Sequence, residues 1–154
     1  MYNIINLFKQ RCQVGKINIK KLNCWCQSDP RWGALKIGET NLTLAKDGCY
    51  IVSISMLLNK TPDIVLAILN RNRCFNAKGE LINDLVARVL KMKYSYTAEN
   101  PNKICICETN HYIKVGFPQH FFVNLNNGSI NDPLTGTTKK NPYNIVSYRL
   151  WDMV

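Results

Sequence analysis

The sequence of 154 residues lacks any apolar run near the roughly 20 residues that a membrane-spanning helix needs, so no span is expected. The stretch Met1–Phe8 is apolar but interrupted by asparagine, and no small-residue cleavage site follows it. We therefore expect no signal peptide. Internal repeats, low-complexity tracts and flexible linkers are also missing. These absences predict one domain over residues 24–154, preceded by an N-terminal extension over residues 1–23.

Acidic residues are scarce, because 10 Asp and Glu stand against 20 Lys and Arg and give a formal net charge of +10. The lysines are scattered, with the densest clusters at Lys20–Lys21, Lys91–Lys93 and Lys139–Lys140. No arginine-rich arm or RNA-binding aromatic signature accompanies them, so no specific nucleic-acid partner is predicted. A solubilising surface is the favoured interpretation, and contact with an anionic polymer stays open.

Cysteine is frequent, with 7 residues, but the number is odd and no secretory signal precedes it. Reduced thiols in a cytoplasmic protein are expected, or a released or virion-associated protein if a phage encodes it. The asparagine- and lysine-rich composition suits an AT-rich bacterial or phage genome. The pairs Cys24/Cys26 and Cys105/Cys107 could each present two thiolates on one side of a strand, and four thiolates could bind zinc. Buried thiols are favoured instead, so neither a metal nor a cofactor is expected.

Hydrophobic residues make up 46% and charged residues 19%, which is the balance of a folded domain. Hydrophobic periodicity predicts helices over residues 49–58, 62–72 and 81–91, with Thr61 as N-cap of the second. It predicts strands over residues 104–107, 112–115, 121–125 and 146–150, and a hairpin turn at 126–128. Residues 27–47 read as a surface loop, and residues 1–23 as a helix-like start followed by a short strand. The class is α+β, with a helical N-terminal half packed on an antiparallel sheet.

Cys49 differs from the other cysteines because it opens a predicted helix, directly after Gly48. A helix N-terminus favours negative charge, and a thiol attacks carbonyls only as the thiolate. Glycine before the helix permits a tight bend and leaves room for a substrate. Cys49 is therefore the candidate nucleophile.

Histidine is rare, so the base for such a thiol must be His111 or His120. His120 begins a predicted strand, and a hairpin could return Asp132 beside it, where the carboxylate would orient the ring. His111 has no such partner, so His120 is favoured. The Cys49 amide and the side-chain amide of Gln27 are the candidate donors to an oxyanion.

The segments Trp25–Gly33, Gly48–Cys49, Thr61–Pro62, His120–Val123 and Asp132–Pro133 resemble the papain-like family related to the bacteriocin-processing, double-glycine leader peptidases. The resemblance covers roughly residues 24–136. It implies a papain-like fold, with Cys49 as nucleophile, His120 as base and acid, Asp132 as orienting residue and Gln27 as oxyanion donor. The lysine-rich N-terminal extension is not part of the pattern, and the stretch between His120 and Asp132 is compact.

The leading hypothesis is thus a cysteine peptidase or amidase that acts through an acyl-enzyme on a peptide or protein. A second is a phage or bacterial hydrolase, endolysin-like, that cleaves the peptidoglycan stem and uses its positive charge to bind wall polymers. A third is a catalytically idle binding or inhibitor protein on the same fold. The sequence leaves the scissile bond and the oligomeric state open.

Overall fold

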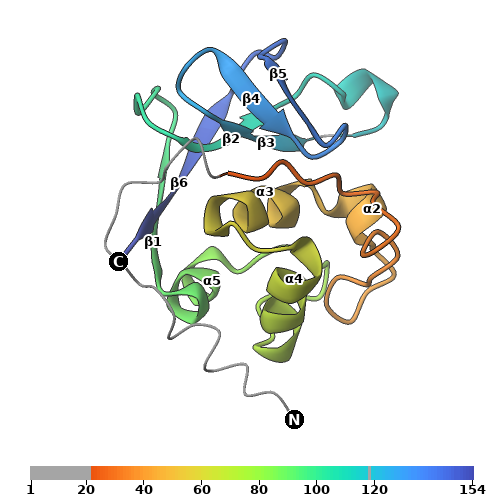
Figure 1. The fold of residues 1–154 in the computed structure, drawn as a ribbon. Helices are drawn as coiled ribbons and strands as arrows, with labels where there is room; N and C mark the ends of the chain where they lie inside the picture. Colours follow the sequence, from red (N-terminus) through yellow and green to blue (C-terminus); the bar gives the residue numbers. More distant parts are fainter. Residues whose placement is uncertain (1–21, 118) are drawn as a thin grey trace.

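A computed structural model describes residues 22–117 and 119–154 of the chain. The expected helix-like start and strand of the N-terminal extension fall in residues 1–21, outside the described residues. The structure is mixed helix and antiparallel sheet, as predicted (Figure 1). The helices are α2 (Leu44–Asp47), α3 (Cys49–Leu58), α4 (Pro62–Arg71), α5 (Asn83–Leu90) and the 3₁₀ helix η2 (Ile113–Val115). The strands are β1 (Met92–Thr97), β2 (Cys105–Thr109), β3 (His120–Asn124), β4 (Ser129–Asp132), β5 (Thr137–Lys140) and β6 (Ser147–Met153).

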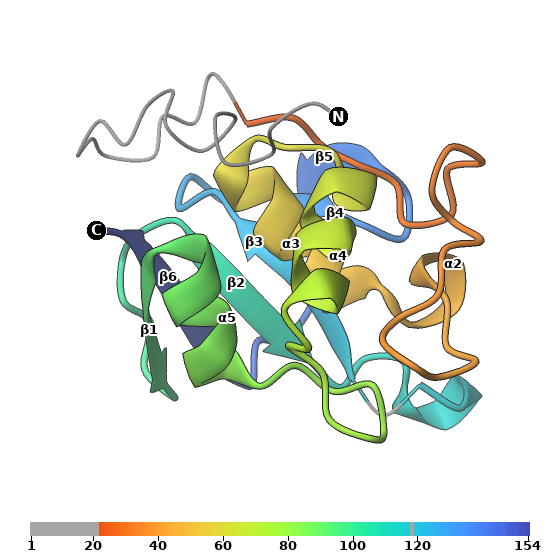
Figure 2. The same ribbon diagram turned by 90° about the horizontal axis from the view of Figure 1, so that it is seen from below.

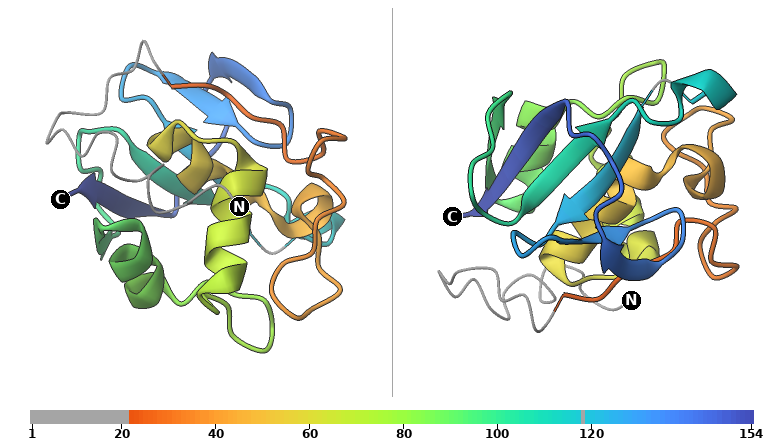
Figure 3. Two further views of the ribbon diagram at one scale, coloured as in Figure 1. Left: turned by 60° about the horizontal axis from the view of Figure 1, so that its bottom comes forward. Right: turned by 90° about the horizontal axis from the view of Figure 1, so that it is seen from above.

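The strands form one six-stranded sheet in the order β1-β6-β2-β3-β4-β5, and every neighbouring pair is antiparallel. The helices gather on one face of this sheet, and the view from the other side leaves the strands in front (Figures 2 and 3). Alternation along β3 explains the two faces, since Phe121 and Val123 join the core beneath the helices. Phe122 joins a smaller cluster with Cys105 and Cys107 on the opposite face.

Helix α3 is the centre of the core, between the sheet and α4 (Figures 1 and 2). It is buried on nearly all sides, from Ile51 to Leu57, which explains why its apolar residues do not form one stripe. Two buried serines in it keep their hydroxyls satisfied, because Ser53 donates to the Cys49 carbonyl and Ser55 to the Ile51 carbonyl, each at 2.8 Å. The predicted bounds of this helix are confirmed.

The start of α3 depends on glycine for a reason other than the one expected. Gly48 has φ −88°, which any residue can adopt. A Cβ there would lie 2.5 Å from the Leu44 carbonyl oxygen and 2.7 Å from Leu44 Cδ2. Gly48 is therefore required so that α2 and α3 can approach closely, and the thiol of Cys49 is held at this junction.

Three local predictions are wrong. Residues 27–47 are not merely a surface loop, since Trp32, Ile37 and Leu44 are buried in the core. The third helix starts at Asn83 and not at residue 81, because Leu81 pairs with Phe75 in a β-bridge.

Residues 112–115 form the 3₁₀ helix η2 and not a strand. The Thr109 hydroxyl accepts from the His111 amide, and the Ile113 amide donates to the Asn110 carbonyl. This local turn bonding takes the place of strand pairing.

The prediction of a helix start at residues 61–62 is confirmed, with Thr61 at the N-cap position and Pro62 in the first turn, although the Thr61 side chain makes no capping hydrogen bond. The turn at residues 126–128 is confirmed as well, because Asn126 and Gly128 have φ of 57° and 85° between β3 and β4. Strands β1, β4 and β5 were not anticipated.

Replacement of Gly48 by alanine tests the junction between α2 and α3. We expect Gly48→Ala to lower the free energy of unfolding by about 2–3 kcal/mol, because the new methyl group overlaps the backbone of Leu44. Urea denaturation followed by circular dichroism measures this. Gly116→Ala is the control, since a Cβ at Gly116 meets nothing within 4 Å and only its φ of +92° opposes the change. Equal losses in both variants would contradict the steric explanation.

Candidate active site

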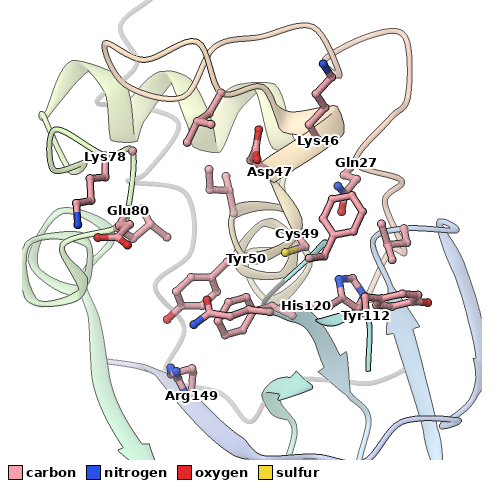
Figure 4. Close-up of a pocket in the computed structure, with 18 of the residues that line it drawn as sticks. Gln27, Lys46, Asp47, Cys49, Tyr50, Lys78, Glu80, Tyr112, His120 and Arg149 are labelled. Atoms are coloured by element: carbon pink, nitrogen blue, oxygen red, sulfur yellow. The ribbon is translucent and has the colours of Figure 1, made fainter. Parts of the chain in front are cut away.

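A cavity of about 640 Å³ lies at the N-terminal end of α3, beside the start of β3. Cys49, Gln27 and His120 all line it (Figure 4). The rest of its wall comes from α2, the turn before α5, β6 and the segment around η2. The sequence-predicted residues Cys49, Gln27 and His120 are thus brought to one cavity from three separate parts of the chain.

Cys49 is the first residue of α3, and its thiol is partly buried. Burial raises the pKa of this thiol to about 11, although the backbone amides of Phe121, Tyr50 and Cys49 itself act in the opposite direction. The sequence suggested that the helix start favours a thiolate at Cys49. The structure shows that the helix start alone does not give one at neutral pH. Ionisation of Cys49 requires a base that accepts its proton.

His120 and Asp132 form a buried pair. The Nε2 atom of His120 lies 2.9 Å from Oδ1 of Asp132, and the two side chains are 3% and 0% exposed. The hairpin of β3 and β4 brings them together, as predicted, with Val123 opposite Asn131 in the ladder. Because a carboxylate only accepts hydrogen bonds, Nε2 carries the proton in this pair, and Nδ1 of the neutral ring keeps the lone pair of a base.

Asp132 has three further donors that sequence reasoning missed. Lys139 Nζ lies 2.7 Å from Oδ2, the Tyr143 hydroxyl donates to Oδ2 at 2.7 Å, and the Leu134 amide donates to Oδ1 at 3.0 Å. Burial raises the pKa of Asp132, but the bonds from His120, Lys139 and Tyr143 outweigh it, so this pKa lies well below the usual range. Asp132 is therefore an anion in the folded protein at neutral pH.

The hydroxyls around this carboxylate form a directed chain. The single hydroxyl hydrogen of Tyr143 is used on Asp132, so the Tyr112 hydroxyl, at 2.8 Å, donates to the Tyr143 oxygen. The Tyr112 ring also packs edge-on against His120, with centroids 5.5 Å apart. The donors thus fix both the carboxylate and the face of the histidine ring.

Gln27 is 2% exposed and is held from two sides. Its backbone amide donates to the Pro133 carbonyl at 2.8 Å, and its Nε2 donates to the Ala45 carbonyl at 2.8 Å. One hydrogen on Nε2 remains, and Oε1 is buried without a hydrogen-bond partner among the described residues. An unsatisfied buried amide at a cavity wall is suited to a ligand with polar groups.

The turn between β4 and β5 packs against the segment that contains Gln27. A Cβ on Gly136 would lie 2.6 Å from the Cβ of Cys26, so only glycine allows this turn to approach the Gln27 segment. On the other side, Trp32 Nε1 donates to the Cys26 carbonyl at 2.8 Å. The segment around Gln27 is thereby fixed relative to Asp132.

His111, the alternative base, is exposed and does not line the cavity. Its ring packs on Tyr112 and Tyr143, with centroids 4.9 and 5.2 Å apart. The geometry favours His120.

The cysteine pair on β2 lies away from the cavity. Cys105 and Cys107 point to the same side of β2, with sulfurs 3.9 Å apart, in the smaller hydrophobic cluster. Within residues 22–117 and 119–154, no group of three or more His, Cys, Asp or Glu side chains is arranged to hold a metal ion. Cys105 and Cys107 pack as small hydrophobic side chains there.

Asp132 predicts a specific loss of stability in acid. Its pKa is depressed in the folded protein, so its contribution is complete above the ordinary aspartate value of about 4 and is lost as the pH falls through and below that value. Between about pH 5 and about pH 2, the free energy of unfolding should therefore fall further in wild type than in Asp132→Asn. Urea denaturation at each pH measures this.

The control for this experiment is Asp152→Asn, which removes an exposed ion pair with Lys103 and should leave the acid dependence close to that of wild type. Identical pH profiles for wild type and Asp132→Asn would contradict the assignment of Asp132 as a buried anion.

The comparisons with known proteins add no relative. No protein-family model, curated protein or solved structure gives a significant match to the chain. No single helix among the described residues is long and apolar enough to cross a membrane, and α3 and α4 reach that length only as a pair bent by 107°. The site must therefore be interpreted from its own geometry.

Proposed function

We propose that this chain is a papain-like cysteine hydrolase, a peptidase or amidase that cleaves an amide bond through an acyl-enzyme. One observation carries the proposal: Cys49, at the start of a buried helix, shares a cavity with a histidine whose Nε2 is bound to a buried carboxylate. The chain order Gln27, Cys49, His120 and Asp132 supports it. The position of Cys49 at a helix start and the presence of His120 on the wall of the same cavity support the pairing of a nucleophile with a base.

In the first step, Nδ1 of His120 accepts the proton of the Cys49 thiol as the sulfur forms a bond to the substrate carbonyl carbon. Asp132 stabilises the imidazolium through Nε2. The imidazolium then gives this proton to the leaving amine, the C–N bond breaks, and a thioester remains on Cys49. Water, deprotonated by Nδ1, attacks the thioester, and the carboxylic acid product leaves with regeneration of the thiol.

The negative oxygen of the tetrahedral intermediate needs hydrogen-bond donors. The amide of Cys49 is one of the first amides of α3, which have no partner within the helix. The remaining hydrogen on Gln27 Nε2 is the second donor, and its bond to the Ala45 carbonyl fixes the side-chain amide. Removal of such a donor typically lowers kcat by about 100- to 1000-fold.

The cavity wall supports a peptide with an apolar side chain as the substrate. Val115, Phe117 and Leu134 line the cavity and are 67%, 53% and 39% exposed. Exposed large apolar side chains beside a reaction centre are suited to bind an apolar group of the substrate. Peptidoglycan stems carry few large apolar side chains, so a peptide or protein is favoured over the wall-acting alternative.

Cys49→Ala is the direct test of the nucleophile. We expect it to abolish cleavage of a peptide library, measured by mass spectrometry, and to remove the fastest iodoacetamide labelling of the chain, because Cys49 is the thiol that lines the cavity with His120. Cys105→Ala, which alters a buried thiol away from the cavity, is the control and should retain activity. Equal loss in both variants would contradict the assignment of Cys49.

Two further outcomes separate the alternatives in the same assay. Clearing of purified cell walls that depends on Cys49, without cleavage of the peptides, would favour the wall-acting hydrolase. Retained binding of peptides by wild type without any cleavage would favour the idle binding protein. Either result would overturn the proposal in its present form.

A second prediction concerns the apolar wall of the cavity and compares two residues of the segment around η2. Phe117→Ala should raise KM about 10-fold for peptides with a large apolar side chain next to the scissile bond, because an apolar contact is lost. Ile113→Ala is the matched control, since Ile113 is 58% exposed but does not line the cavity. Steady-state kinetics on the same peptides decide between them, and an equal effect of both changes would remove the role of the wall.

A further inference from the structure

Lys139 contacts the triad carboxylate on the oxygen that His120 leaves free. Its Nζ lies 2.7 Å from Oδ2 of Asp132, whereas His120 binds Oδ1 at 2.9 Å. We propose that Lys139 is an electrostatic positioning residue, whose ammonium group neutralises Asp132 and so keeps His120 a neutral imidazole and Cys49 a thiol until substrate binds. The part that concerns Cys49 rests on the proposed function, and the part that concerns His120 does not.

The placement of Lys139 follows from the β4–β5 ladder. Ile130 lies opposite Lys139 in this ladder, and Ile130 and Asp132, two residues apart, share one face of β4. Lys139 is therefore the diagonal neighbour of Asp132, within reach of a long side chain. It is 32% exposed while Asp132 is 0% exposed, so its stem spans from the edge of the sheet to the buried carboxylate.

The charge of Lys139 acts on the histidine through the carboxylate. A lone buried anion would attract a proton to the imidazole strongly, because Coulomb interactions are weakly screened in the interior. With the ammonium on the same carboxylate, the buried pair is close to neutral, and the gain from protonating His120 is smaller. Tyr143 donates to the same oxygen but carries no charge, so it orients Asp132 without neutralising it.

The titratable groups that face the pair come from several elements. They are Cys24 before the Gln27 segment, Cys49 on α3, Tyr112 before η2, Tyr143 after β5, His111 beyond the two tyrosines, and Lys139 itself. Lys46, Asp47 and Arg149 also line the cavity, but Lys139 is the lysine that forms an ion pair with Asp132. Its removal should therefore change the protonation of His120 more than removal of any neutral neighbour.

A thiol in the resting state agrees with the surroundings of Cys49. Burial raises the pKa of that thiol to about 11, so a thiolate there needs a cation beside it. A neutral His120 does not supply one. Transfer of the proton then accompanies attack on the substrate and does not precede it.

A matched pair of variants tests the role of Lys139. Lys139→Gln and Lys140→Gln each lower the formal net charge by one, but Lys140 is exposed and lies outside the Asp132 cluster. The chain has only two histidines, so the ring signals of His111 and His120 can be told apart by NMR after His111→Gln.

We expect the midpoint of the His120 titration to move about one pH unit higher in Lys139→Gln. In Lys140→Gln it should move far less. Equal midpoints in the two variants would overturn the proposal.

The second measurement is the rate at which iodoacetamide alkylates Cys49 at pH 6 (about the pH where a histidine titrates), followed by mass spectrometry. Lys139→Gln should react about 3- to 10-fold faster than wild type, because an imidazolium favours the thiolate. Lys139→Arg restores the charge and should restore the wild-type rate. Lys139→Met replaces Lys139→Gln if the latter does not fold by near-UV circular dichroism.

The two readouts separate the two proposals. A shifted His120 titration without a change in Cys49 alkylation supports the electrostatic role of Lys139 and contradicts the pairing of His120 with the thiol. An unshifted titration contradicts the role of Lys139 whatever the alkylation rate. Lys139→Arg that behaves like Lys139→Gln would show that charge is not what Lys139 contributes.

Discussion

The hydrogen bond between His120 and Asp132 is the interaction on which the organisation of the site depends. It selects the nitrogen that can act as a base, and it places a charge in the interior that must be compensated. The compensation is local, because Lys139, Tyr143 and the Leu134 amide all bind the same carboxylate. One buried anion thereby recruits β3, β4, β5 and the segment that follows them into a single unit.

The second constraint is the burial of α3. The helix delivers Cys49 from the core, where movement of the backbone is limited by packing on nearly all sides. Gly48 lets α2 dock against its start, and α2 in turn presents the Ala45 carbonyl to Gln27. Cys49 and Gln27, the proposed nucleophile and oxyanion donor, are therefore supported by the same helix junction, while the proposed base His120 and its partner Asp132 are supported by the sheet. The proposed chemistry occurs where these two rigid parts meet.

Periodicity predicted the helix over residues 49–58, because a long apolar run is a strong local signal. The turn signal at residues 126–128 predicted that a hairpin returns Asp132 to His120. Periodicity did not predict the short strands β4 and β5. Residues 137–140 contain no apolar side chains and form a strand only by pairing with β4. Lys139 and Tyr143 were missed for this reason. Their approach to Asp132 follows from cross-strand register and from the return of the chain after β5, neither of which any local pattern encodes.

The ionisation of Cys49 was the other failure of sequence reasoning. A helix start is visible in the sequence, but the degree of burial around the thiol depends on contacts from β3 and the distant cavity wall. Burial acts against charge more strongly than the helix amides favour it. Local context therefore identified the thiol that lines the cavity and gave the wrong direction for its ionisation.

The position of β5 at the edge of the sheet has a separate consequence for association between copies of the chain. An edge strand offers unpaired backbone groups to any other extended segment, and nature often protects such edges with lysine. Lys139 and Lys140 lie side by side at this edge, and a second copy aligned along β5 would bring like charges together. Lys139, which pairs with the Asp132 carboxylate, thus also opposes edge-to-edge aggregation, so this short strand is constrained by colloidal stability as well as by the proposed chemistry.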